Sequence, residues 1–206
     1  SVASFADGST VVVWQSPDAA GSGVFGQKLT ALGAPSGSQF QVNTTTANGQ
    51  FGPSVATLSD GGFVVSWTSF GQDVAGTYGI RAQRYTNALA ATPAGGEIGV
   101  NATTAGDQMH PSVTGLSGGG FMAVWDNAGN VTMRRFDGTG AAVGGDVVVQ
   151  QSGTGSIGHQ PGAGLETEAS EDFSLAQLVD GRVVVVWYGP EGAIPNIAFG
   201  RIFDFA

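Results

Sequence analysis

Four tryptophans, each closing a short apolar run that follows a glycine-containing turn, show that one unit is repeated four times along this chain. The runs are VVVW at 11–14, FVVSW at 63–67, FMAVW at 121–125 and VVVVW at 183–187. The tryptophans are 53, 58 and 62 residues apart. Repeats of this length are typical of propeller blades, and they constrain the fold because each copy must form the same supersecondary unit.

Within a copy, apolar and polar residues alternate in short segments separated by Gly, Asp, Asn and Pro. The second copy is clearest, with segments at 54–58, 63–69, 79–85 and 97–101. Alternation with a period of two indicates β-strands. Asp60-Gly61 between the first two segments favours a tight hairpin, since glycine accepts the positive φ that such turns require. Each copy is therefore predicted to form four antiparallel strands.

The last copy is one strand short. The first and third copies supply four segments each, whereas the fourth supplies only 174–178, 182–187 and 196–203. The sequence thus predicts fifteen strands in place of sixteen. An unpaired sheet edge of this kind invites strand addition from a neighbouring polypeptide.

These patterns predict an all-β fold, a small β-propeller of four antiparallel blade-like repeats whose last blade lacks its fourth strand. We expect a single repeat domain over 1–206, with repeats of approximately 1–52, 53–110, 111–173 and 174–206. A β-sandwich or an open repeat array is the alternative.

The net charge of the chain limits the classes of partner that it can bind. Seven Lys and Arg against sixteen Asp and Glu give a net charge of −9, and Lys28 is the only lysine. Nucleic acid is excluded as a partner, because phosphate binding needs a basic field. No apolar run is long enough for a membrane-spanning helix, so membrane insertion is not expected.

The segment QFGPSVATLSDGGFVVSW at 50–67, followed by GQD at 71–73 and GIRAQRY at 79–85, resembles a repeat of very large secreted bacterial proteins. Proteins with this repeat often carry calcium-binding RTX-type tails and act at cell surfaces or in biofilms. The resemblance implies a β-propeller-like array that is secreted or exposed at a bacterial cell surface. It also implies calcium binding where the loop after the tryptophan strand is rich in Asp and Gly.

The two loops that match this description contain Asp18 and Asp73, one carboxylate each. Calcium takes six to eight oxygen ligands, several of them from carboxylates. These residues are the candidate metal ligands, and calcium is the only cofactor expected. The competing interpretation is that each aspartate forms a turn.

Two further sets of residues stand out. Alignment of the third strands places Lys28, Arg84, Arg135 and Arg201 in one register. This predicts that each forms an ion pair with a carboxylate of its own or an adjoining repeat, such as Glu97 or Asp146. The four tryptophans are expected to lie between neighbouring sheets, each burying on the order of 200 Å².

Tyr78 and Tyr188 fall in loops and are the candidate ligand contacts, because aromatic faces stack on sugar rings.

No catalytic signature accompanies these features, so the chain is not expected to be an enzyme. The favoured function is a non-enzymatic, extracellular structural or adhesive repeat module that mediates protein–protein or surface assembly and is stabilised by calcium. Its partner would be another protein or a second copy, bound through the open edge of the last blade. A carbohydrate-binding, lectin-like propeller is the alternative, and a glycan-processing enzyme is the third interpretation.

Overall fold

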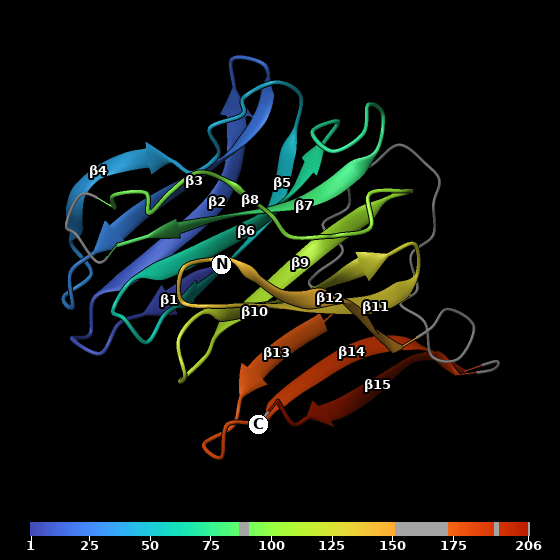
Figure 1. Cartoon of the computed structure of the whole chain (residues 1–206). Helices are drawn as coiled ribbons and strands as arrows, with labels where there is room; N and C mark the ends of the chain where they lie inside the picture. Colours follow the sequence, from blue (N-terminus) through green and yellow to red (C-terminus); the bar gives the residue numbers. More distant parts are fainter. Residues whose placement is uncertain (87–90, 151–172, 192–193, 206) are drawn as a thin grey trace.

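The computed structural model of the chain describes residues 1–206 except 87–90, 151–172, 192–193 and 206. Its described residues form fifteen β-strands in four antiparallel sheets, which follow one another along the chain (Figure 1). The first three sheets have four strands and the last has three. The prediction of an all-β chain with an incomplete last repeat is confirmed.

The strands follow one another in each sheet in chain order. The first sheet contains β1 (Val2–Ser4), β2 (Thr10–Asp18), β3 (Gly21–Leu29) and β4 (Pro35–Gln41). The second contains β5 (Gln50–Thr57), β6 (Phe63–Phe70), β7 (Tyr78–Tyr85) and β8 (Ile98–Gly99). The third contains β9 (Gln108–Gly115), β10 (Phe121–Asn127), β11 (Asn130–Phe136) and β12 (Ala142–Gln150). The fourth contains β13 (Phe173–Gln177), β14 (Val183–Glu191) and β15 (Ile194–Phe203).

The glycine turns form the first hairpin of every sheet. In the second sheet the Leu58 amide donates to the Gly62 carbonyl at 2.9 Å, and Gly61 adopts a φ of 82°. A side chain at Gly61 would be strained in that conformation, which explains the glycine. The same turn recurs at the equivalent place in the other three sheets.

Each sheet presents two different faces to its neighbours. The trailing face carries the tryptophan and the residues that alternate with it, and it packs against the preceding sheet. The leading face carries the residues between them and packs against the following sheet. In the second sheet, Val65 and Trp67 on the trailing face join a core with Val11 and Val13 of the first sheet, whereas Val64 on the leading face joins the core shared with the third and fourth sheets.

The sheets therefore pack in chain order. β1 and β2 pack against β5, β5 against β9, and β9 against β13. Among the described residues no extensive packing joins the first sheet to the fourth, and the two lie at opposite ends of the series (Figure 1). The described part of the chain contains no helix with the length and apolar character needed to cross a membrane.

The exposure of each tryptophan depends on whether a preceding sheet covers its ring. Trp67 and Trp125 are 0% exposed and Trp187 is 3% exposed, as predicted. Trp14 is only half-buried, so the prediction fails for the first copy. The reason is that Trp14 lies on the trailing face of the first sheet, where the structure has no preceding sheet to cover it.

Candidate functional site

The fourth sheet leaves one strand edge uncovered. In the other sheets the outer edge of the third strand pairs with β4, β8 or β12. β15 pairs with β14 on one side and has no partner on the other among the described strands. A row of backbone donors and acceptors on such an edge can bind a further strand.

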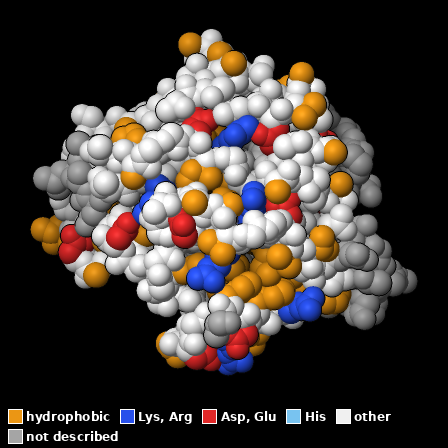
Figure 2. All heavy atoms as spheres, viewed as in Figure 1, with side chains coloured by type: hydrophobic (Ala, Val, Ile, Leu, Met, Phe, Trp, Pro, Cys, Tyr) orange, Lys and Arg blue, Asp and Glu red, His pale blue; other side chains and the backbone are white. Residues whose placement is uncertain are grey.

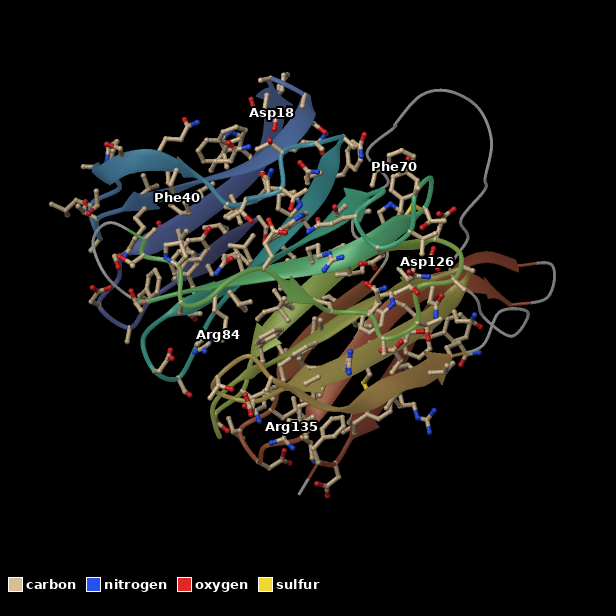
Figure 3. All side chains as sticks on the ribbon, turned by 45° about the horizontal axis from the view of Figure 1, so that its top comes forward. Asp18, Phe40, Phe70, Arg84, Asp126 and Arg135 are labelled. Carbon is tan, nitrogen blue, oxygen red and sulfur yellow. The ribbon has the colours of Figure 1, made fainter. Side chains whose placement is uncertain are left out.

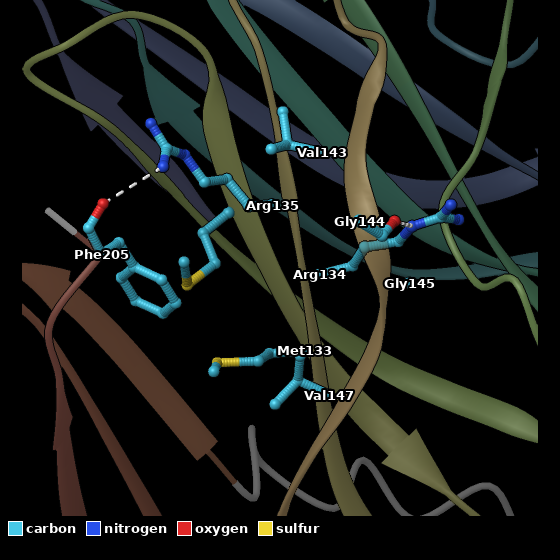
Figure 4. Close-up of a pocket in the computed structure, with 9 residues that line it drawn as sticks. Met133, Arg134, Arg135, Val143, Gly144, Gly145, Val147 and Phe205 are labelled. Atoms are coloured by element: carbon cyan, nitrogen blue, oxygen red, sulfur yellow. Dashed lines mark hydrogen bonds between the residues drawn. The ribbon is translucent and has the colours of Figure 1, made fainter.

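A hollow of about 280 Å³ lies beside this edge, on the leading face of the third sheet (Figure 4). Its apolar lining includes Met133, Val143, Val147 and Phe205. Val143 and Val147 are 47% and 46% exposed, although both lie on a sheet face that is otherwise buried. Figure 2 shows hydrophobic side chains gathered in this region with basic side chains at the margins. We call the hollow and the free edge of β15 together the open-edge site.

The basic margin of the open-edge site is held in place by backbone carbonyls. Arg135 donates to the Phe205 carbonyl at 3.5 Å, and Arg134 donates to the carbonyls of Gly144 and Val100 at 3.0 and 3.1 Å. These arginines therefore fasten one sheet to the next. Arg135 places a positive charge at the margin of the apolar floor, whereas Arg134 lies on the opposite face of β11, toward Val100.

The register of the third strands corrects one prediction. Lys28, Arg84 and Arg135 lie opposite the residues three positions before the tryptophans, as aligned. In the fourth sheet that position is taken by Ile202, and Arg201 lies one residue away on the opposite face. The irregular pairing between Gly189 and Glu191 shows that the loop after Trp187 differs from those in the other copies.

The predicted pairing with a carboxylate of the same or an adjoining repeat holds for Arg84, but Glu97 and Asp146 are not the partners of these cations. Arg84 pairs with Asp60 in the glycine turn of its own sheet at 2.8 Å, and Lys28 lies 4.9 Å from the centre of the Phe5 ring. Glu97 and Asp146 instead accept hydrogen bonds from the loop that follows the preceding sheet. In Figure 3 the labelled Arg84 and Arg135 lie toward the opposite end of the sheets from the labelled Asp18.

Glu97 forms the best-defined contact of this kind. Its carboxylate accepts hydrogen bonds from the amides of Thr44 and Thr45 at 2.5 and 3.0 Å and from the Gln72 side chain at 2.6 Å. Burial on its own would raise the pKa of Glu97, but these hydrogen bonds together outweigh it and hold the pKa below the usual range. Asp146 binds the amides of Ala102 and Thr103 in the same way.

Buried amides connect neighbouring sheets at the same loops. Asn43 donates to the Gln50 side chain at 3.0 Å, and Asn101 donates to the Gln108 side chain at 3.2 Å. Both glutamines are 0% exposed. The spacing of seven residues recurs in the sequence and could have revealed this pair. Sequence reasoning missed it because Asn and Gln between strands were read only as loop residues.

The two candidate calcium ligands occupy equivalent places beside these amides. Asp73 pairs with Arg81, and its second oxygen accepts from Asn101 at 2.8 Å. Asp18 accepts from the Ala20 amide at 2.9 Å and from Gln41 at 3.2 Å. They belong to different sheets and do not form one site. Among the described residues no group of three or more His, Cys, Asp or Glu side chains is arranged to hold a metal ion.

The two candidate aromatic contacts lie on strands and not in loops as predicted, since Tyr78 is the first residue of β7 and Tyr188 belongs to β14. Tyr78 is half-buried and packs against Phe51 and Phe70, with ring centres 6.1 and 4.9 Å away. Tyr188 lies on β14, but its side chain is outside the described residues. In Figure 3 the label of Phe70, the last residue of β6, marks the position of this cluster. The three rings form a small aromatic surface that the sequence located only through Tyr78.

Comparison with known proteins places this fold among the β-propellers. No family model and no curated protein matches the chain. A Penicillium chrysogenum α-L-arabinanase complexed with arabinobiose matches with a TM-score of 0.60 and 14% identity, over 96% of this chain and 54% of that one. A Fusarium graminearum GH93 α-L-arabinofuranosidase gives a TM-score of 0.59 at 13% identity, over 95% and 55%. A Bacillus licheniformis GH43 endo-arabinanase gives 0.50 at 13%, over 97% and 71%.

At these identities the likeness concerns the fold alone. The chain spans about half the length of the Penicillium and Fusarium structures that it matches. Four antiparallel sheets packed in chain order, each with a tryptophan on the same face, agree with this comparison. The chain has the architecture of a β-propeller, with the open-edge site at its incomplete fourth sheet.

Proposed function

We propose that the chain is a non-enzymatic, extracellular structural or adhesive repeat module that assembles by binding an extended strand of another polypeptide at the open-edge site. The observation that carries the proposal is the presence of a free strand edge on β15 together with an apolar hollow between the third sheet and Phe205, two residues past the end of β15. Strand addition needs both, because main-chain hydrogen bonds supply affinity and side-chain pockets supply specificity. The resemblance of residues 50–85 to repeats of secreted bacterial proteins supports the extracellular setting.

The roles of the acidic side chains support a structural function. Asp7, Asp137 and Asp180 accept backbone hydrogen bonds in the glycine turns and hairpins. Glu97 and Asp146 fasten adjacent sheets together. A glycosidase mechanism requires a pair of carboxyl groups flanking a substrate. Each of these five acids instead stabilises the chain's own backbone.

A peptide titration tests the open-edge site. The probe is a synthetic peptide with the sequence of the chain's own outer strand, AVGGDVVVQ at 142–150. We expect saturable binding by calorimetry, and at least tenfold weaker binding to Val147→Asp, which places a charge in the hollow. The matched protein control is Leu32→Asp, a 96% exposed position in the turn between β3 and β4, which should bind as the unchanged chain does.

A second peptide separates strand pairing from simple hydrophobic adsorption. In it, proline replaces the second-last valine, which removes a backbone donor and disrupts the ladder. Binding should then be lost although the peptide stays apolar. Equal binding of both peptides, or no binding of either, would contradict the proposal.

Calcium stabilisation is the secondary part of the proposal. Asp18 and Asp73 each supply one carboxylate at a loop. In both cases the carboxylate also accepts a hydrogen bond from a side-chain amide, of Gln41 and Asn101 respectively. Bound calcium would raise the melting temperature by mass action. The measurement is the melting temperature in millimolar calcium and in chelator, with Asp18→Asn as the variant. An unchanged melting temperature would remove calcium from the proposal.

A glycan-binding surface is the second candidate. It is favoured by the half-buried cluster of Phe51, Phe70 and Tyr78, and by the fold shared with proteins whose structures contain arabinobiose. Stacking on a sugar ring should be lost in Tyr78→Ala and kept in Tyr78→Phe. A glycan array probed with both variants tests this, and equal signals from them would exclude Tyr78 as a sugar contact.

A further inference from the structure

The glycine turn of the third sheet lacks an acid that the other three turns carry. Asp7, Asp60 and Asp180 occupy one turn position, and each carboxylate accepts a hydrogen bond from the backbone amide two residues on, at 2.9, 2.8 and 3.1 Å. The backbone bonds that close each turn place Gly118 at this position in the third sheet. Within the described part of the chain, no side chain accepts from the Gly120 amide two residues on.

The acid of the second sheet also neutralises a cation. Asp60 accepts a hydrogen bond from Arg84 at 2.8 Å. Arg135 is the counterpart of Arg84 in the third sheet, and both lie toward the same end of the sheets (Figure 3). Arg135 forms no ion pair with a described carboxylate, and its guanidinium donates only to the Phe205 carbonyl, at 3.5 Å, among the described residues. The cation is therefore retained where the acid is missing.

The place of the missing side chain is open. Gly118 and Arg135 line one hollow of about 210 Å³ at the turns of the third and fourth sheets, which we call the turn pocket. A Cβ atom on Gly118 would meet no atom within 4 Å, and Gly118 is not among the residues with positive φ. The backbone therefore does not require glycine here. Both residues belong to the third sheet, which packs against a described sheet on each side.

Two acids in the same lining already act on another cation. Asp180 and Asp204 line the turn pocket, and Arg182 donates to Asp180 at 2.6 and 2.9 Å. Asp180, through these hydrogen bonds and its charge, and Asp204, through its charge, raise the pKa of Arg182. The charge of Arg135 is left for an outside anion. The two acids also weaken that attraction, so we expect dissociation constants in the millimolar range.

We infer that the turn pocket binds a carboxylate group of another molecule, held by the Arg135 guanidinium at the position that an aspartate takes in the other turns. The contact reproduces the one that Arg84 makes with Asp60. A hydrogen bond between a guanidinium and a carboxylate is roughly twice as strong as one between neutral groups. The inference goes beyond the proposed function, because the ligand contacts the turn of the third sheet and not the edge of β15.

The rest of the lining indicates what the carboxylate is attached to. Leu116, Val183 and Phe205 line the turn pocket beside Arg135. A carbon chain can cover these apolar groups, whereas inorganic phosphate would leave them in contact with water. The ligand is therefore a carboxylate on a short carbon chain, supplied by a free organic acid or by an acidic side chain of another polypeptide.

Titration with sodium butyrate at constant ionic strength, followed by ¹H–¹⁵N NMR, tests the inference. We expect saturable shifts of the backbone amides of 116–120 and of the Arg135 Nε signal. Sodium phosphate should bind about tenfold more weakly or less. Equal shifts with phosphate, or no saturable shift with butyrate and with the aspartyl probe described below, would overturn the inference.

Removal of the cation should abolish the site. Arg135→Gln should weaken butyrate binding about tenfold or more, since it removes a charged hydrogen-bond donor. The matched control is Arg134→Gln, which alters the opposite face of β11 and should bind butyrate as the unchanged chain does. Weakening of equal size in the two variants would contradict a site at Arg135.

Two exchanges between the second and third turns test the site without removing an arginine. Gly118→Asp should occupy the turn pocket from within, abolish butyrate binding and raise the melting temperature by about 2–4 °C. Asp60→Gly should create a second butyrate site at Arg84, with new shifts at 58–62. Butyrate binding that persists in Gly118→Asp, or an unchanged number of sites in Asp60→Gly, would overturn the inference.

A second probe identifies the source of the carboxylate and separates this inference from the proposed function. N-acetyl-aspartyl amide carries its carboxylate on a peptide backbone, so its binding in place of butyrate would identify an acidic side chain as the ligand. Butyrate binding alone would identify a free acid. The 142–150 peptide should bind Gly118→Asp as it binds the unchanged chain. Peptide binding without binding of either carboxylate would overturn the inference and leave the proposed function intact.

Discussion

The interior of the sheet series and its two ends carry apolar residues at equivalent positions, but these residues differ in what lies next to them. Trp125, between the second and third sheets, is 0% exposed, whereas Trp14 on the first sheet is half-buried. Val13 is 1% exposed, and its equivalent Val186 at the other end is 37% exposed. In a repeat array each sheet gains its stability from its neighbours, so the end sheets have half of that support.

Polar contacts accompany the apolar packing where two described sheets meet. These contacts combine the apolar face with buried amides such as Asn101 and Gln108 and with the Glu97 carboxylate. The first sheet carries Gln39 in the place of that acid. The polar groups therefore belong to the contacts between neighbouring sheets.

The largest expected effect contrasts two tryptophans. Trp125→Ala should lower the free energy of unfolding by about 3–5 kcal/mol, because it leaves a cavity between two sheets. Trp14→Ala should cost only about 1–2 kcal/mol when the chain is monomeric, because its ring is half in water. Urea unfolding followed by circular dichroism at low protein concentration measures both. Equal losses would show that the first sheet is as well packed as the interior.

The buried amides give the next effect. Asn101→Ala removes the partners of the Gln108 Oε1 atom and of the Ile80 amide, although the Gln108 Nε2 atom still donates to the Ala105 carbonyl, so we expect a loss of about 2–3 kcal/mol. The control Gln39→Ala, on the first sheet, should change stability by less than about 0.5 kcal/mol. Both variants can be compared in the same urea titration. A small loss for Asn101→Ala would mean that water replaces the amide.

The Glu97 contact gives a smaller, pH-dependent effect. Its pKa is lowered in the folded state, so the ionised carboxylate stabilises the fold above the usual glutamate pKa of about 4.3, and this stability is lost as the pH falls through the folded-state pKa. Glu97→Gln should lower stability by about 1 kcal/mol at pH 7 and by less at pH 3. Melting temperature against pH measures the difference. A gap that widened in acid would contradict this sign.

The smallest expected effect on stability concerns an acid introduced on the first sheet of the series. Gln39→Glu places on the first sheet the acid that Glu97 supplies on the second. No loop of a preceding sheet is described there to donate hydrogen bonds to it. We expect stability within about 0.5 kcal/mol of the unchanged chain at every pH. A clear stabilisation at neutral pH would indicate that a loop reaches Gln39 after all. The same series of melting curves provides this result.

Much of the fold could be predicted from the sequence because its determinants are local. Alternation with a period of two and glycine at turn positions such as Gly61 depend on the residues themselves, so the fifteen strands and the incomplete last sheet were predictable. Burial of Trp14 was not, because four equivalent tryptophans give no sign of which sheet lacks a neighbour. Arg201 was misplaced by one residue because strand register depends on an irregular loop.

One part of the candidate site could be predicted from the sequence and the other could not. The free edge of β15 followed from counting strands, but the hollow beside it depends on how Phe205 and Met133 pack across two sheets. The expected pairing of cations with Glu97 was wrong because opposite charges in sequence say nothing of which end of a sheet they occupy. Glu97 binds backbone amides of the preceding loop, an interaction that sequence alone leaves undetermined.

The most direct test of the account is the solvent exposure of the four indole rings, read by ¹⁹F NMR of 5-fluorotryptophan protein with a soluble paramagnetic agent. One resonance should broaden strongly, and Trp14→Phe should assign it. Broadening of two or more resonances, or a protected Trp14, would contradict an array whose interior faces are closed and whose first sheet has no neighbour on its trailing face.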